Sequence, residues 1–237
     1  MPTSTYNKRR SQLTTYFDQT AAAAWRALTS NDPVSRIRAT VRAGRDTMRG
    51  TLLDWLPEDL DGQTLLDAGC GTGALAIEAA KRGAHVVAID VASNLVEVAR
   101  ERAAEEEMSG SIDFHVGDML ADAPVEVDHI VAMDSLIHYD ANDVQTVVTE
   151  FATRARRSII FTSAPWTPAL GLMHVVGRLI PHRHHRAPSI QPIRIDGLTR
   201  SLDAALDSEG WSTRETHRVK SGFYISEGVR MELACSN

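Results

Sequence analysis

Residues 64 to 73 of this chain read Thr64-Leu65-Leu66-Asp67-Ala68-Gly69-Cys70-Gly71-Thr72-Gly73. A short apolar run ends in an acid, three glycines then alternate with small residues, and a helical pattern resumes from Ala74 to Lys81. This order predicts a buried strand, a tight turn and a helix start. Glycines let a backbone approach a ligand closely, and the N–H groups of a helix start favour anionic or polar groups. We therefore interpret the stretch as a cofactor-binding turn.

The glycine spacing is compatible with two kinds of cofactor. Gly69, Gly71 and Ala74 fit the G-x-G-x-x-G/A pattern of dinucleotide-binding proteins. No lysine followed by Ser or Thr closes the turn, which excludes a P-loop. Asp67 before the first glycine and the early third glycine, Gly73, resemble motif I of class I S-adenosylmethionine-dependent methyltransferases. That resemblance implies a carboxylate that helps to place the methionine amino group of the cofactor.

Two further acids follow apolar runs that read as strands. Asp90 ends the run from His85 and lies about 20 residues after the glycines, where an acid accepts hydrogen bonds from ribose hydroxyls. Asp118 follows the run from Ile112 to Val116. In the methyltransferases an acid at this place accepts from the adenine amino group. This third acid favours S-adenosylmethionine over NAD as the cofactor.

Strand and helix patterns alternate through the middle of the chain, which predicts a parallel sheet. The last two strand patterns, separated by Lys220-Ser221-Gly222, indicate an antiparallel hairpin. The expected fold is α/β: a Rossmann-like seven-stranded class I methyltransferase sheet with helices on both faces. We expect an N-terminal helical arm or lid (1–50), a cofactor-binding core (51–164), a substrate cap inserted after strand five (165–192), and a C-terminal part of the core with the hairpin (193–237).

Composition narrows the functional classes. The chain has 237 residues and a formal net charge of −6, which does not suggest a nucleic-acid partner. Its two cysteines include Cys70 inside the glycine turn, which fits a reducing compartment, and we expect a cytoplasmic protein. The first ten residues are polar and basic, unlike a signal peptide, and no apolar run reaches the length of a membrane span. Peripheral association with a membrane stays open.

Two segments outside the strands also attract attention. The arginines at positions 36, 38, 42 and 45 interleave with a partial apolar stripe, and we interpret them as a solvated helix face. Between Pro165 and Pro192, residues 169–180 read as an apolar helix that has more than one packing partner. The basic cluster His182-Arg-His-His-Arg186 follows. We interpret it as a hydrated loop, the alternative being a site for an anionic substrate or a protein partner.

Several stretches together resemble one family, the magnesium-protoporphyrin IX O-methyltransferases of bacteriochlorophyll and chlorophyll synthesis. These stretches are Tyr16-Phe17-Asp18 with Trp25, Pro33-Val-Ser-Arg-Ile-Arg, the glycine turn, Met133-Asp-Ser-Leu-Ile-His-Tyr139, Ile160-Phe-Thr-Ser-Ala-Pro165 and Gly222-Phe-Tyr-Ile-Ser226. The resemblance implies methyl transfer from S-adenosylmethionine to a propionate carboxylate of magnesium protoporphyrin IX. The products are the monomethyl ester and S-adenosylhomocysteine. It also suggests docking to the magnesium chelatase that supplies the substrate, and no metal bound by the protein itself.

The resemblance and the motifs together give a set of expected site residues. His138 is expected to act on the acceptor carboxyl, as a base or as a positioning group, and Tyr16 to close over the cofactor. Residues expected to bind the cofactor are Tyr16, Asp67, Gly69, Cys70, Gly71, Gly73, Asp90, Val91, Asp118, Met119, Met133 and Ser135. Residues expected to bind the porphyrin are His138, Tyr139, Leu170, Met173 and His174.

Three rival functions remain at this point. One is another class I methyltransferase that acts on a small carboxylate, amine or quinone. A second is an NAD-dependent oxidoreductase, which the glycine pattern alone permits. A third is a protein without catalytic activity that carries porphyrin or docks on the magnesium-inserting enzyme.

Overall fold

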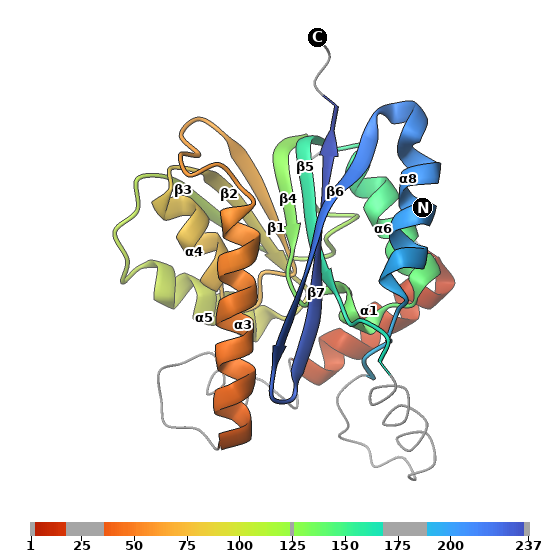
Figure 1. Ribbon diagram of the computed structural model, residues 1–237. Helices are drawn as coiled ribbons and strands as arrows, with labels where there is room; N and C mark the ends of the chain where they lie inside the picture. Colours follow the sequence, from red (N-terminus) through yellow and green to blue (C-terminus); the bar gives the residue numbers. More distant parts are fainter. Residues whose placement is uncertain (1–2, 18–35, 124–125, 168–188, 235–237) are drawn as a thin grey trace.

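The computed structural model describes residues 3–17, 36–123, 126–167 and 189–234. At the centre of this part of the chain lies one seven-stranded sheet in the order β3-β2-β1-β4-β5-β7-β6 (Figure 1). Its strands are β1 (Thr64–Ala68), β2 (His85–Asp90), β3 (Ser111–Val116), β4 (Val127–Ala132), β5 (Ala155–Ser163), β6 (Trp211–Ser221) and β7 (Tyr224–Leu233). Strands β1 to β5 are parallel, whereas β7 is antiparallel to both β5 and β6. The expected parallel sheet with an antiparallel pair at one end is confirmed.

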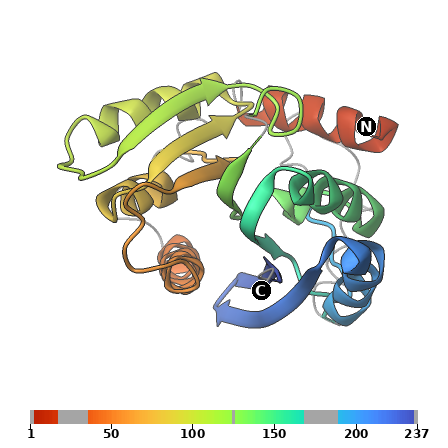
Figure 2. The same cartoon turned by 90° about the horizontal axis from the view of Figure 1, so that it is seen from above.

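Helices cover both faces of the sheet (Figure 2). The helices are α1 (Ser4–Tyr16), α3 (Arg36–Asp54), α4 (Ala74–Lys81), α5 (Ser93–Ala103), α6 (Ala141–Ala152) and α8 (Ile195–Leu206), with short 3-10 turns η2 (Leu136–His138) and η3 (Asp207–Glu209). α3 and α4 share one apolar cluster with the sheet, and α6 and α8 share another. α5 packs against β2 and β3. Because the central strands are covered on both faces, consecutive residues along them are buried, as in residues 65–68 of β1 and 158–163 of β5.

α3 runs without a break through residue 50, where we expected the boundary between arm and core. Met48 and Leu52, four residues apart on one helix face, are completely buried. At Gly44 a Cβ atom would lie 2.6 Å from Cδ1 of Tyr224, so the helix touches β7 directly. α3 is therefore part of the core, and α1 also contributes two buried side chains, Tyr6 and Leu13, to the other apolar cluster.

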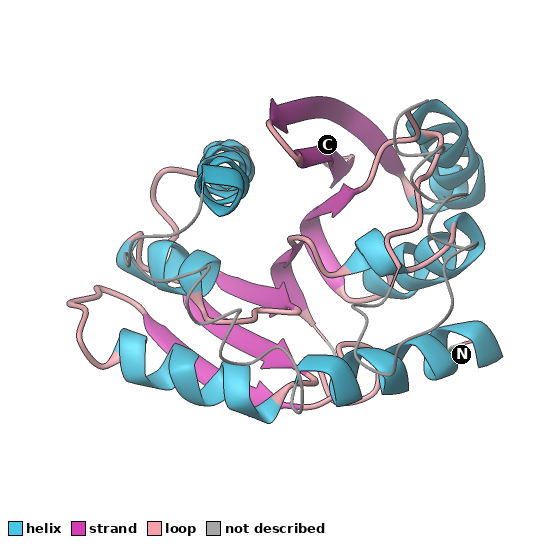
Figure 3. Ribbon diagram, turned by 90° about the horizontal axis from the view of Figure 1, so that it is seen from below, coloured by secondary structure: helices cyan, strands magenta, loops and turns pink. Residues whose placement is uncertain are grey.

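α1 crosses the carboxyl edge of the sheet on the side of α6 (Figure 1). The Tyr6 ring stacks on Tyr139 with 4.9 Å between centroids. The hydroxyls of Thr3 and Thr5 both donate to Asp143 in the first turn of α6. Seen from this edge, α1 and α3 lie on opposite sides of the strand ends (Figure 3). The carboxyl ends of the parallel strands point into the space between these two helices.

Element boundaries differ from the expected ones at a few places. The helical sequence pattern that begins at Ser93 continues to Glu107, but α5 ends at Ala103, because Glu105, Glu106 and Glu107 would put three negative charges at the negative end of the helix dipole. Phe223, expected in the last strand, lies in the turn between β6 and β7. Residues 20–29 of the expected helical arm and the helix expected over 169–180 lie outside the described residues.

Candidate active site

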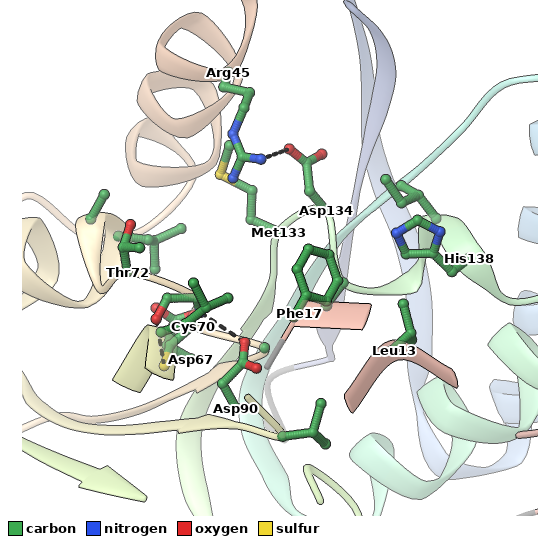
Figure 4. A pocket seen from close by; sticks show the side chains of 18 of the residues that line it. Leu13, Phe17, Arg45, Asp67, Cys70, Thr72, Asp90, Met133, Asp134 and His138 are labelled. Atoms are coloured by element: carbon green, nitrogen blue, oxygen red, sulfur yellow. Dashed lines mark hydrogen bonds and ion pairs between the residues drawn. The ribbon is translucent and has the colours of Figure 1, made fainter. Parts of the chain in front are cut away.

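A cavity of about 570 Å³ opens at the carboxyl edge of the sheet (Figure 4). Its walls come from α1, α3, the glycine turn after β1, the end of β2 and the loop after β4. This volume is in the usual range for a ligand site. Ligands of open α/β sheets bind beyond the carboxyl ends of the strands, so the cavity has the expected place.

The glycine turn forms the floor of the cavity. Gly69 and Gly71 line it in the left-handed region, with φ of 86° and 54°. At Gly69 a Cβ atom would lie 2.4 Å from Cβ of Ser135, so a side chain there would collide with the loop after β4. Gly73, φ 79°, precedes α4 and does not line the cavity; a Cβ there would meet Ala99 of α5 at 2.9 Å. Gly73 therefore serves the close packing of two helices, and the structure does not bring it to the expected cofactor site.

Asp67, at the end of β1, has a buried carboxylate with an orphaned oxygen. The residue is 1% exposed, and its Oδ2 has no hydrogen-bond partner although Asp67 lines the cavity. Burial, reinforced by the charge of Asp90, raises the pKa of Asp67 to about 7. An unpaired buried carboxylate is costly, and an ammonium group of a ligand would remove that cost. The methionine amino group of S-adenosylmethionine is such a ligand group.

Asp90, at the end of β2, is held in place by the backbone. Its Oδ2 accepts from the N–H of Gly71 at 2.9 Å, and its Oδ1 accepts from the N–H of Ala92 at 2.9 Å. Each carboxylate oxygen can accept a second hydrogen bond. Asp90 lines the cavity beside Val91, and its binding to ribose hydroxyls stays a prediction.

Asp118 does not line the cavity, in contrast to our expectation. Its Oδ2 accepts from Tyr6 Oη at 3.2 Å and from Arg10 Nη1 at 2.7 Å, and its Oδ1 accepts from the N–H groups of Leu120 and Ala121. Burial alone would raise the pKa of Asp118, but the hydrogen bonds of Arg10 and of the two backbone groups outweigh it and lower that pKa. The carboxylate thus anchors α1, and an adenine amino group would have to compete with Arg10 for it.

The loop after β4 supplies a further part of the cavity wall. Met133, Ser135, His138 and Tyr139 all line the cavity, as expected, and Ser135 Oγ is buried without a partner. His138 Nδ1 lies 3.5 Å from the carbonyl oxygen of Ser189. The four residues thus form part of the cavity wall, where the Tyr139 ring is already stacked on Tyr6.

The arginines of α3 are the main feature that the sequence interpretation missed. Arg42, Arg45 and Arg49 line the cavity rather than forming a solvated face. The Arg45 guanidinium points toward the Asp134 carboxylate, with 3.6 Å between Nη1 and Oδ2 (Figure 4). The spacing of three and four residues, next to the buried Met48, was the available signal, since such residues share one helix face.

The remaining expected residues divide into two groups. Tyr16, Cys70 and Met119 line the cavity, and the Tyr16 ring meets that of Phe17 edge to face at 5.1 Å. Leu170, Met173 and His174 lie outside the described residues, as does the basic cluster at 182–186. Within the described ranges no group of His, Cys, Asp or Glu side chains could hold a metal ion. In the same ranges no helix is long and apolar enough to cross a membrane.

This sheet, with β7 between β5 and β6, and the cavity over the glycine turn define a class I S-adenosylmethionine-dependent methyltransferase. A family model described as "Methyltransferase domain" matches residues 65–157, and one described as "Magnesium-protoporphyrin IX methyltransferase C-terminus" matches residues 132–232. The magnesium-protoporphyrin O-methyltransferase of Rhodobacter capsulatus is 45% identical over 94% of this chain and 96% of the relative. The chain belongs to the magnesium-protoporphyrin IX methyltransferase family.

Two more distant relatives agree with this assignment. The chloroplastic magnesium protoporphyrin IX methyltransferase of Arabidopsis thaliana is 32% identical over 89% of this chain and 67% of its own length. The crystal structure of magnesium protoporphyrin IX methyltransferase from Synechocystis PCC 6803 with bound S-adenosylhomocysteine superposes with a TM-score of 0.82 at 26% identity. That match covers 95% of this chain and all of the other. The fold expected from the sequence is thus confirmed.

Proposed function

We propose that this protein transfers a methyl group from S-adenosylmethionine to a propionate carboxylate of magnesium protoporphyrin IX. The products are the monomethyl ester and S-adenosylhomocysteine. Chief support comes from a single cavity that joins the orphaned Asp67 oxygen to the side chains of His138 and of the α3 arginines, in a chain of this family. One end of the cavity contains a carboxylate that can bind a cationic cofactor. The other end contains arginine side chains that can bind an anionic acceptor.

The reaction requires little acid–base catalysis by the protein. S-adenosylmethionine supplies a methyl group on a sulfonium, whose sulfur takes the electron pair of the broken S–C bond as an acceptor oxygen forms the new O–C bond. A propionate has a pKa near that of Glu, about 4.3, and is ionised at neutral pH. The residues of the cavity therefore mainly align the carboxylate and exclude water.

We assign the expected residues to two subsites. Asp67 binds the ammonium of the cofactor and Asp90 its ribose, with Gly69 and Gly71 giving the backbone room to approach. His138 holds the acceptor carboxylate over the loop after β4. Tyr16 closes the site from α1, at the end of the helix that Arg10 fixes to Asp118.

The test is direct. The protein is incubated with S-adenosylmethionine carrying a labelled methyl group and with magnesium protoporphyrin IX, and the porphyrin products are separated and identified by mass. We expect label in a monomethyl ester. Binding of S-adenosylhomocysteine by calorimetry without any labelled porphyrin would reject this acceptor, and label in an added quinone or amine would identify the rival methyltransferase.

We also propose that the substrate arrives from the magnesium chelatase at the mouth of the cavity. Phe223 and Ile190 line the cavity and are 68% and 43% exposed, an unusual place for apolar side chains. Phe223→Ser should weaken co-sedimentation with chelatase subunits. If it instead weakens flotation with lipid vesicles and leaves chelatase binding unchanged, the mouth contacts a membrane surface.

A further inference from the structure

Arg45 brings a guanidinium group into the wall of the cavity. Its guanidinium faces the cavity from α3, and its side chain is 19% exposed. In Figure 4, Asp134 stands between Arg45 and His138, while Asp67 and Asp90 lie toward the cofactor end. Arg45 and His138 can therefore serve different parts of one acceptor.

Asp134 has hydrogen-bond partners besides the arginine. Tyr224 Oη donates to its Oδ1 at 3.0 Å, and Thr162 Oγ1 donates to the same oxygen at 3.3 Å. The N–H of Asp134 in turn donates to Thr162 Oγ1 at 2.7 Å. Among the described residues Asp134 is the one non-glycine residue with a positive φ, 55°. Such backbone strain persists where the surroundings fix it and is common at ligand sites.

The pair of Arg45 with Asp134 is loose by comparison. Its 3.6 Å between Nη1 and Oδ2 exceeds the 2.7–2.9 Å or so of a strong charge-assisted hydrogen bond. Arg49, one turn further along α3, pairs with Asp46 of its own helix at 2.8 Å. Arg45 therefore brings to the cavity wall a planar fork of a kind suited to bind a carboxylate through two parallel hydrogen bonds.

We infer that Arg45 binds the acceptor carboxylate that is not methylated. An arginine on the reacting carboxylate would hold the oxygen lone pairs that must attack the methyl group. It would also face a neutral ester after the reaction. On the other carboxylate the ion pair persists from substrate to product, so it contributes to binding without opposing methyl transfer.

This placement also accounts for a single methylation. For a second transfer the porphyrin must turn around, which brings the methyl ester to Arg45. An ester cannot form the ion pair, and a lost charge-assisted hydrogen bond corresponds to about 10- to 100-fold in affinity. Arg45 would therefore select the diacid over the monoester.

Because the inference rests on the proposed function, the experiment compares variants with an active parent. Arg45→Gln should raise KM for magnesium protoporphyrin IX about 10- to 100-fold, change kcat only a few-fold, and form dimethyl ester on long incubation. Arg45→Lys keeps the positive charge but lacks the planar fork of a guanidinium group. Its KM for magnesium protoporphyrin IX should lie between those of Arg45→Gln and the parent. Arg38→Gln, an exposed arginine of the same helix that does not line the cavity, should behave as the parent.

The outcomes separate the two proposals. An unchanged KM with monoester alone in Arg45→Gln overturns the role of Arg45 while the proposed function stands. A weaker affinity of Arg45→Gln for S-adenosylhomocysteine by calorimetry would assign Arg45 to the cofactor instead and equally overturn it. A parent that binds S-adenosylhomocysteine but converts no porphyrin rejects the proposed function itself.

Discussion

Asp67 couples cofactor binding to pH through its orphaned oxygen. Its pKa of about 7 means that roughly half of the molecules carry a neutral Asp67 at neutral pH. Binding an ammonium group favours the charged form, so below pH 7 a proton must leave as the cofactor binds. We expect the Kd of S-adenosylmethionine to rise about tenfold for each pH unit below 7, as the linkage of one proton requires.

Calorimetry between pH 5.5 and 7.5, in buffers of different ionisation enthalpy, measures both the Kd and the proton released. Over this range the α-amino group of the cofactor stays mostly charged. Asp67→Asn should bind more weakly and show no pH dependence, whereas Asp54→Asn, at an exposed carboxylate, should follow the parent. A parent Kd that does not change with pH would remove Asp67 from the ammonium subsite.

His138 allows a distinction between proton removal and positioning. A propionate is already ionised at neutral pH, so we expect positioning. The kcat of His138→Ala should then be lower than that of the parent by less than about 100-fold. This deficit should be nearly constant from pH 6.5 to 9, and His138→Gln should recover part of the lost kcat. A general base would give a larger deficit, on the order of 10²- to 10⁴-fold, that shrinks as pH rises and the acceptor ionises unaided. The pH–rate profiles of both variants against the parent decide between the two.

At the scale of elements, the close packing of α3 on β7 fixes where its arginines point. Gly44→Ala gains up to about 1 kcal/mol of helix propensity. However, its new methyl group would lie 2.6 Å from the Tyr224 ring, and such overpacking costs about 1–3 kcal/mol. We expect a net loss of stability and a higher KM for the acceptor, since the shift of α3 moves Arg45.

Gly50 on the same helix is the matched control. A Cβ atom there meets nothing within 4 Å, so Gly50→Ala should gain about 0.5–1 kcal/mol and leave KM unchanged. Urea unfolding of the two variants and the parent measures the free energies. Equal stabilisation by both substitutions would show that α3 is not tightly packed at Gly44.

α1 is anchored at few points and should respond to the cofactor. Tyr6 and Arg10 bind Asp118, and the threonines before them bind Asp143, while Tyr16 and Phe17 reach the cavity. We expect amide exchange in α1 to slow when S-adenosylhomocysteine binds, and Arg10→Ala to speed exchange in this helix alone. Mass spectrometry of exchanged peptides measures both effects. Equal exchange in α1 with and without ligand would contradict a closing role for Tyr16.

The elements that could be predicted from the sequence are those specified by local patterns. The glycine turn, the parallel strands and the acids Asp67 and Asp90 follow from residues close together in the chain, and each lies at the expected edge. Arg45 and Asp118 could not be placed in this way. Their surroundings depend on how α3 meets β7 and how α1 crosses the sheet, which are contacts between residues about 90 to 180 positions apart. Local periodicity gives a helix face but not the partner of that face.

At the scale of the whole molecule, a buried histidine of β4 forms hydrogen bonds with β5 and with the residue that precedes β1. His129 Nε2 lies 2.8 Å from Gln63 Oε1, and Nδ1 lies 2.7 Å from Ser158 Oγ. Since an amide oxygen only accepts, Nε2 carries the proton, and the neutral ring accepts the Ser158 hydroxyl at Nδ1. Burial lowers the pKa of His129 to about 4, so the ring is uncharged in the folded protein at neutral pH.

This histidine should make the protein less stable in mild acid. The unfolded chain binds a proton at His129 as the pH falls below about 6.5, whereas the folded chain does so only near 4. The stability lost across this window is on the order of 3 kcal/mol. Asp67 acts in the opposite direction, because a carboxyl whose folded pKa is raised contributes stability that is lost as the pH rises through about 7. In the parent, the unfolding free energy therefore depends on pH through both groups, which act in opposite directions.

The difference between parent and variant isolates the histidine. His129→Gln keeps hydrogen-bonding groups at the site but does not titrate, so its unfolding free energy should fall less steeply than that of the parent between pH 6.5 and 4. Asp67→Asn should show the reverse, a steeper fall, since it removes the compensating group. Urea unfolding at half-unit pH steps, without cofactor, gives all three profiles. Parallel curves for the parent and His129→Gln would mean that His129 is charged in the folded protein or that its pKa is not shifted by burial in the sheet.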